Sequence, residues 1–217
     1  GGVYYVSYLQ LDKVLDAQRP LSAVGADGAP AHDEMLFIVV HQTYELWFKQ
    51  VLHEVDSVIR LLDRSPVEER HMGTIVHRLE RVARIQKVLA DQITVLESMT
   101  PLEFLAFRDC LVPASGFQSV QFRELETRLG MRRTLRLTYQ QTEYVRFFTA
   151  ADRERLERAE KLPSLFDVVE RWLERTPFVE HATFSFWQEY RRAVDAELAR
   201  QRAQVAASPY YGAADDA

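Results

Sequence analysis

The stretch His32–Gln50, HDEMLFIVVHQTYELWFKQ, decides the fold of this chain. Its apolar residues, and those that follow as far as Leu62, recur on a period of 3.6 residues. This pattern predicts one long helix from about Glu34 to Leu62, with Asp33 as the N-terminal cap. His41 is out of place in such a helix, because six apolar residues come directly before it.

Outward from this stretch the chain continues as a row of helices. A second long helix is expected over about 71–98, and the two most simply pack as an antiparallel pair. A short helix is expected from Tyr8 to just before Pro20, and another from Thr100 to before Pro113. Further helices are expected at 118–130, 138–159, 164–176 and 184–205. Clear start and stop signals support several of them: the capping box of TPLE at 100–103, Gly130, and the pair Ser164 and Asp167. No strand-like alternation is visible. The sequence therefore predicts an all-α fold, a helical bundle forming a single domain over residues 1–217.

Composition narrows the class of protein. The 217 residues are 47% hydrophobic and 27% charged, with a net charge of −5, which is ordinary for a globular protein. The mixed charges argue against nucleic-acid binding, and no apolar run is long enough to predict a membrane span. The one cysteine, Cys110, excludes an internal disulfide and favours the reducing cytoplasm. We expect Cys110 to be a small core residue.

His41 shares its helix face with Phe37 and Glu45, and Tyr44 lies three residues away. One interpretation is a core histidine that hydrogen-bonds a neighbouring carbonyl or Tyr44, since buried polar groups are usually satisfied. The other is an imidazole that faces an aromatic-lined pocket and hydrogen-bonds a ligand. The residues alone favour the first interpretation and leave the second open.

Arg108 raises a similar question, because Phe104 lies one turn before it and Leu111 almost one turn after it. A buried guanidinium without an anion is costly. It could extend to solvent or pair with a nearby acid, for which the candidates are Glu45, Glu103 and Asp109. Alternatively it could hold the carboxylate of a substrate with two parallel hydrogen bonds. The spacing does not choose between these alternatives.

Other chemical sites are not indicated. No pair among the six histidines has the His-x-x-x-His or Glu-x-x-His spacing of a metal site. Cys110 has no histidine or acid placed by sequence to activate it, and no Gly-x-Ser-x-Gly elbow is present. We assign no metal ligand in this chain.

Four segments of the sequence resemble the haem-dependent tryptophan 2,3-dioxygenase family. They are YVSYLQLDKVLDAQRPLS (5–22), HDEMLFIVVHQTYELWFKQVLHE (32–54), MTPLEFLAFRDCLVPASGFQSVQFRELE (99–126) and PSLFDVVERWLERTP (163–177). The second and third are long and specific, and together the four extend over most of the first 177 residues.

The resemblance implies a role for each matching residue. His41 would be the distal histidine above the haem and would hydrogen-bond the indole N–H of the substrate, with Phe37 in the same wall. Arg108 would pair with the substrate carboxylate, and Leu111 would pack on the indole. Phe104 stands where some members have a tyrosine that also contacts the carboxylate, so Arg108 would do more of the holding.

The resemblance also implies contacts with the cofactor and between subunits. Ser115, in the turn PASGF, would approach the haem edge. Tyr5, Tyr8 and Leu9 would reach into the pocket of a neighbouring subunit. The family assembles as an intertwined homotetramer, a dimer of dimers that exchange this N-terminal segment.

The implied reaction inserts both atoms of O2 across the C2–C3 bond of the indole and opens L-tryptophan to N-formylkynurenine, at the head of tryptophan catabolism. Haem b would bind and activate O2, and the protein would orient the substrate and exclude water. His41 would be an orienting catalytic residue and not an essential base.

The rest of the family pattern is missing. Members are longer and carry the iron-ligating histidine in a C-terminal helix pair, followed by a loop of Gly-Thr-Gly-Gly type; none of the histidines here, His181 included, matches that ligand. We expect an incomplete chain of a longer enzyme, in preference to a shortened homologue. Two other functions stay open: a haem-dependent monooxygenase of a substituted tryptophan in secondary metabolism, and a haem-free helical binding protein.

Overall fold

The structure is a computed structural model that describes residues 2–23, 28–64, 67–131, 148–175, 180–181 and 184–206. Its helices are α1 (Tyr5–Leu9), α2 (Leu11–Val14), α3 (His32–Leu62), α4 (Met72–Leu96), α5 (Pro101–Arg108), α6 (Val120–Leu129), α7 (Ala150–Glu160), α8 (Leu165–Arg175) and α9 (Phe186–Ala206). Three short 3-10 turns are η1 (Glu69–His71), η2 (Asp109–Leu111) and η3 (Gly116–Gln118). The all-α prediction is confirmed.

A small hairpin was not expected from the sequence. Its strands β1 (Glu180–His181) and β2 (Phe184–Ser185) pair antiparallel. His181 lies in the first of these strands. The last helix begins at Phe186, after the hairpin. Of the helix predicted over 138–159, residues 138–147 lie outside the described residues, and α7 covers the remainder.

The chain divides into two compact units, residues 1–168 and 169–217. In the second unit α9 carries an aromatic cluster near its start, where Phe186, Trp187 and Tyr190 contact one another with ring centroids 5.2–6.2 Å apart. The first unit contains the helix pair and every residue to which a role was assigned. The prediction of a single domain stays a prediction.

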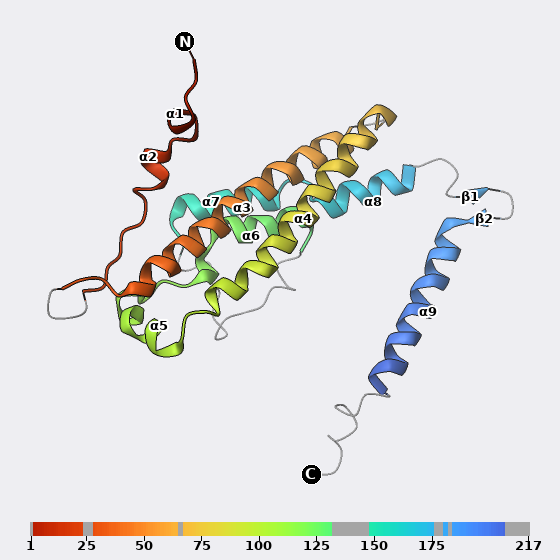
Figure 1. Cartoon of the computed structure of the whole chain (residues 1–217). Coiled ribbons are helices and arrows are strands. Elements are labelled where there is room, and N and C mark those ends of the chain that lie inside the picture. Colours follow the sequence, from red (N-terminus) through yellow and green to blue (C-terminus); the bar gives the residue numbers. More distant parts are fainter. Residues whose placement is uncertain are drawn as a thin grey trace. The chain divides into compact units, whose positions relative to one another are not determined.

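The centre of the first unit is the pair α3 and α4, which lie side by side and antiparallel (Figure 1). Their facing apolar side chains form the core; fully or nearly buried are Val51, Val55, Val58, Ile59, Leu62, Ile75, Val82 and Ile85. Each buried side chain of this kind contributes about 1.5–3 kcal/mol of transfer free energy. The predicted antiparallel pair is confirmed.

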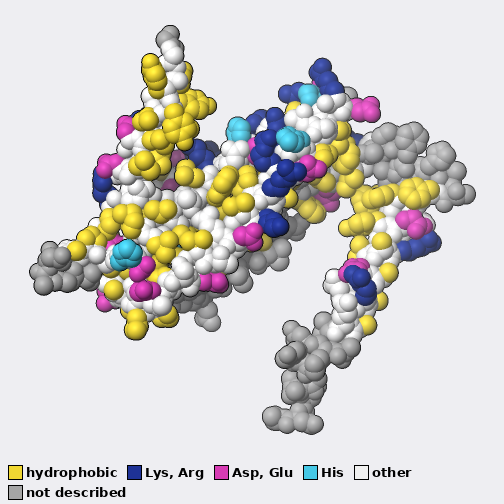
Figure 2. All heavy atoms as spheres, in the orientation of Figure 1, with side chains coloured by type: hydrophobic (Ala, Val, Ile, Leu, Met, Phe, Trp, Pro, Cys, Tyr) yellow, Lys and Arg dark blue, Asp and Glu magenta, His cyan; other side chains and the backbone are white. Residues whose placement is uncertain are grey.

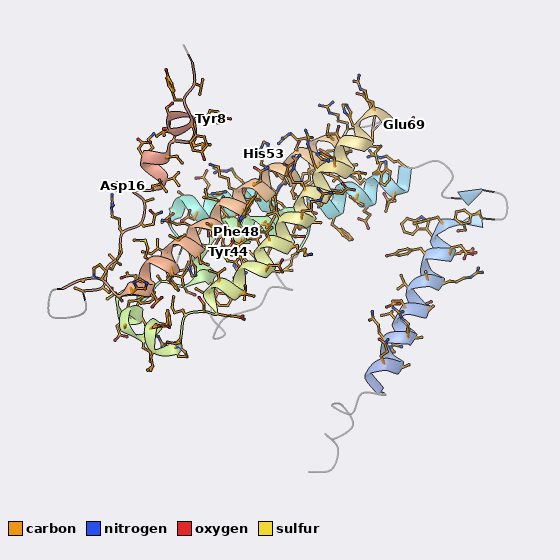
Figure 3. All side chains as sticks on the ribbon, viewed as in Figure 1. Tyr8, Asp16, Tyr44, Phe48, His53 and Glu69 are labelled. Carbon is orange, nitrogen blue, oxygen red and sulfur yellow. The ribbon has the colours of Figure 1, made fainter. Side chains whose placement is uncertain are left out.

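Polar side chains also join these two helices near the middle of α3. The Tyr44 hydroxyl donates to the carbonyl of Leu89 across 2.6 Å, and the Gln92 amide donates to the hydroxyl of Thr43. Tyr44 and Phe48 mark this part of α3 in Figure 3. Phe48 packs on Tyr44 and on Phe122 of α6, with ring centroids 6.0 Å and 5.4 Å apart.

The helix ends test the capping predictions. The capping box at the start of α5 is present, with Thr100 and Glu103 bonded reciprocally. The pair Ser164 and Asp167 forms the same arrangement before α8. The prediction for α3 is wrong: Ala31 is its cap residue and makes no side-chain cap bond, and Asp33 lies inside the first turn. There the carboxylate of Asp33 still favours the helix through its charge near the N-terminus.

Gly130 ends α6 in the left-handed conformation, with φ +108°. A Cβ added there would lie 2.6 Å from Cβ of Phe166, so the position excludes any side chain. We expect Gly130→Ala to lower the free energy of unfolding by about 1–3 kcal/mol, through backbone strain and this contact.

Gly73 offers the matched control for a urea-unfolding measurement. It lies in the first turn of α4, and a Cβ there would meet nothing within 4 Å. Gly73→Ala is expected to stabilise the protein by about 0.4–1 kcal/mol by reducing the entropy of the unfolded chain. Equal effects of the two substitutions would contradict the role of Gly130.

Candidate functional site

A row of rings joins the first half of α3 to α5; we call His41, Phe37, Phe104 and Phe107 the aromatic row. The Phe37 ring lies 4.0 Å from the His41 ring and 5.9 Å from the Phe104 ring, measured between centroids. Phe107, which is 1% exposed, packs edge-on against both phenylalanines. Such ring pairs contribute about 0.5–1.5 kcal/mol each beyond their buried area. The row thus brings three predicted site residues together.

The hydrogen bond of His41 determines what its ring can do. Nδ1 lies 2.7 Å from the carbonyl oxygen of Phe37, one turn back along α3. A carbonyl can only accept, so Nδ1 must carry the proton. In the neutral ring Nε2 is then a hydrogen-bond acceptor, and no described residue hydrogen-bonds it. The interpretation that a neighbouring carbonyl satisfies His41 is correct for one nitrogen, and the other nitrogen is left for a ligand.

His41 lines a groove of about 470 Å³, which we call the His41 groove. This is within the usual size of small-molecule sites, about 300–1,000 Å³. Its walls come from the N-terminal segment, α3 and α6; the lining residues are Lys13, Val14, Ala17, His41, Gln42, Glu45, Leu46, Lys49 and Gln121. Phe37 and Phe104 do not line it but form the aromatic row beside it.

Polar residues that the sequence analysis missed hold the groove walls in place. The Gln121 amide donates to the backbone carbonyl of Glu45 at 2.9 Å and to its carboxylate at 2.7 Å. The Gln42 amide donates to the carbonyl of Ala17 at 3.0 Å and accepts from Gln18. The sequence contained a signal for these wall residues, because Gln42 and Glu45 lie one and four residues after His41 on the same helix.

Arg108 is the last residue of α5 and is exposed. Of the alternatives left open by the spacing, the structure shows the side chain extending to solvent. No described acid pairs with it: Glu103 caps α5, and Glu45 is bonded to Gln121. Arg108 lies one turn after Phe104, on the same face of α5 as the aromatic row. Its guanidinium has no partner among the described residues, and its role toward a carboxylate stays a prediction.

The remaining predicted residues lie at the margins of this region. Leu111 is half-buried in η2. Ser115 is exposed, and its hydroxyl accepts a hydrogen bond from the backbone N–H of Phe117 at the start of η3. Tyr5, Tyr8 and Leu9 on α1 are 73%, 73% and 39% exposed. Figure 2 shows the hydrophobic side chains gathered over α1 and α2, and Figure 3 labels Tyr8 there.

Cys110 is exposed, so the prediction that it belongs to the core is wrong. Cys110 lies in the 3-10 turn η2, which directly follows α5. Its side chain therefore does not take the direction that it would have if α5 continued.

The donor set decides how haem would fit. Within the described residues no group of three or more His, Cys, Asp or Glu could hold a metal ion. His41 already uses Nδ1 on its own helix. Beside the aromatic row, its other nitrogen is available to hydrogen-bond a ligand. None of the described helices has the length and apolarity needed to cross a membrane.

Comparisons with known proteins agree on one family. The sequence model of the tryptophan 2,3-dioxygenase family matches residues 1–211. The tryptophan 2,3-dioxygenase of Dictyostelium discoideum is 50% identical over 207 residues, 95% of this chain and 51% of the relative. That of Alteromonas mediterranea is 50% identical over 195 residues, 90% of this chain and 53% of the relative. That of Anopheles gambiae is 49% identical over 207 residues, 94% of this chain and 52% of the relative. The chain spans about half the length of the curated relatives it matches.

Proposed function

Since the chain belongs to the tryptophan 2,3-dioxygenase family, we propose that it forms the substrate-facing part of a haem-dependent dioxygenase that opens the indole ring of L-tryptophan to N-formylkynurenine. The observation that carries this proposal is the tautomer of His41. Its Nε2 is an acceptor beside an aromatic wall, which matches the single N–H donor of an indole.

The two ends of the substrate would be held by different helices. His41 on α3 accepts the indole N–H, and Arg108 on α5 donates to the carboxylate. Phe37 and Phe104 fill the space between these polar groups with apolar surface. Beside these rings the contact of His41 would be stronger than in water, and the contact of Arg108 would be a charge-assisted pair. Leu111 would add apolar contact with the indole from the turn after α5.

Haem b, when bound, supplies the activation of O2 that an indole ring requires. We propose that Phe37 and His41 line its distal side and that Ser115 approaches its edge. Haem iron needs an axial donor, and no residue of this chain is assigned that role.

The N-terminal segment would complete the pocket of a second subunit. Tyr5 and Tyr8 are each 73% exposed on α1, which is a large cost for aromatic side chains unless a partner covers them. We propose a homotetramer in which this segment is exchanged between neighbouring subunits. With one cysteine and a net charge of −5, we also propose a cytoplasmic enzyme whose partners are L-tryptophan and O2, not nucleic acid or membrane.

The product mass after incubation with L-tryptophan and O2 tests the reaction. A dioxygenase adds two oxygen atoms to the substrate, and a monooxygenase of the same pocket adds one. A Soret band in the visible spectrum of the purified whole protein tests the cofactor. Its absence would favour a haem-free binding protein and overturn the proposal.

His41→Ala is expected to reduce turnover of L-tryptophan about two- to tenfold without abolishing it, because one orienting hydrogen bond of about 0.5–1.5 kcal/mol is lost. Steady-state kinetics of the haem-loaded protein measure this effect. Complete loss of turnover with normal haem content would show that His41 acts as an essential base.

A further inference from the structure

A buried carboxylate ties the segment before α3 to that helix. Glu34, in the first turn of α3, is 1% exposed. It accepts hydrogen bonds from the backbone N–H of Leu21 at 2.7 Å and of Ser22 at 3.0 Å, and from the Ser22 hydroxyl. That hydroxyl in turn accepts from the backbone N–H of Ala31 at 2.8 Å. One side chain therefore organises both ends of the loop that leads into α3.

A second tie lies two turns further along α3. Gln42 donates to the carbonyl of Ala17 and accepts from the Gln18 amide. Between Glu34 and Gln42 the segment 17–22 runs along α3 toward the N-terminal helices. Lys13 and Val14, which precede it, and Ala17, its first residue, form one wall of the His41 groove.

We propose that Glu34 is a positioning residue which, with Gln42, holds the segment 17–22 on α3 so that residues 13–17 close one side of the His41 groove. The effect of Glu34 on catalysis rests on the proposed function. The effect of Glu34 on the structure rests only on its hydrogen bonds. The hydrogen bonds of Glu34 do not involve the aromatic row, and Glu34 is not among the residues that line the groove.

The charge of Glu34 is needed for this role. Every group that faces its carboxylate is a donor, so an uncharged amide of the same shape would turn an N–H toward another N–H. Burial raises the pKa of Glu34, but the hydrogen bonds from Leu21 and Ser22 lower it by a larger amount. The pKa of Glu34 is therefore below its ordinary value. The carboxylate is therefore ionised at neutral pH. A buried charge that loses such partners is costly.

Glu54 provides a matched control on the same helix. It is also buried, at 3% exposure, and its pKa is also lowered despite burial, by hydrogen bonds and charge from its neighbours. Its partners, however, are Arg81 of α4 at 2.7 Å and Gln50 of α3 at 2.8 Å. Removing its charge disturbs the helix pair without touching the N-terminal segment.

Amide hydrogen exchange of the whole protein tests the structural half of the proposal. In Glu34→Gln the amides of Leu21 and Ser22, and those of residues 13–17, are expected to exchange about ten- to a hundredfold faster, the range for loss of a charged hydrogen bond. Glu54→Gln should leave these amides unchanged. Wild-type exchange at residues 13–22 in Glu34→Gln would overturn the proposal.

Kinetics test the positioning half. Glu34→Gln is expected to raise KM for L-tryptophan about threefold or more while kcat stays within about twofold, the pattern for lost binding without lost chemistry. Glu34→Asp, which keeps the charge, should recover part of the change. If Glu34→Gln showed faster amide exchange but an unchanged KM, Glu34 would have only a structural role, and its proposed role in positioning the groove wall for catalysis would be wrong. If the wild-type protein opened no indole ring, the proposed function would fail, and exchange at 13–17 would still decide whether Glu34 places the groove wall.

Discussion

Replacement of Arg108 by alanine is expected to raise KM for L-tryptophan about 10- to 150-fold, because charged hydrogen bonds worth about 1.5–3 kcal/mol are lost. Arg108 is exposed and has no partner among the described residues, so the substitution removes a contact with the ligand and little else. Stability should change by no more than about 0.5 kcal/mol, as for other surface positions. Steady-state kinetics and urea unfolding of the haem-loaded protein measure the two effects.

Two companion variants sharpen this measurement. Arg108→Lys keeps the charge but loses the planar pair of donors, so its KM should fall between those of wild type and alanine. Arg84→Ala removes another exposed arginine, on α4, and should leave KM unchanged. A wild-type KM in Arg108→Ala would reject the role of Arg108 in holding the carboxylate.

Phe107→Ala is expected to lower the free energy of unfolding by about 3–5 kcal/mol, the usual cost of deleting a buried aromatic ring. Phe107 is 1% exposed and lies 5.6 Å from Phe37 and 5.4 Å from Phe104, between ring centroids. Its loss leaves a cavity at the contact between α3 and α5. Urea unfolding followed by circular dichroism measures the change.

The same helix supplies the control. Leu102 on α5 is 79% exposed, so Leu102→Ala should change the free energy of unfolding by no more than about 0.5 kcal/mol. KM should rise in Phe107→Ala as well, because Arg108 is carried by the helix that Phe107 anchors. A stable Phe107→Ala variant would mean that α5 is held on α3 by other contacts.

Local signals predicted the fold well where one short stretch determines the outcome. The capping box of Thr100 and Glu103 and the stop at Gly130 depend on neighbouring backbone groups, and both were correct. The start of α3 was misplaced because a distant group intervenes: the Ser22 hydroxyl accepts from the N–H of Ala31, so Asp33 is not the cap. A bond to a side chain nine residues back along the chain leaves no local pattern.

The candidate site was predictable in its identities but not in its contacts. Spacing placed Phe37 and His41 on one face, and the structure has their rings 4.0 Å apart. Exposure is a tertiary property, so the sequence wrongly indicated burial of Cys110 and could not decide whether Arg108 is exposed. Glu34 was overlooked as a clamp for the same reason, since its partners lie 12 and 13 residues back along the chain.

Two hydrogen bonds prevent α3 from sliding along α4: one joins Tyr44 to Leu89 and the other joins Gln92 to Thr43. A shift by one turn would break both and bury their polar groups unsatisfied. The position of the His41 imidazole along α4 is therefore fixed by the Leu89 carbonyl and the Gln92 side chain of that helix. We expect any widening of the site for a larger ligand to come from α5, which packs on α3 through the aromatic row and has no such polar bonds to it among the described residues. Selection for new substrates should accordingly act on positions 104 to 111 and leave α3 unaltered.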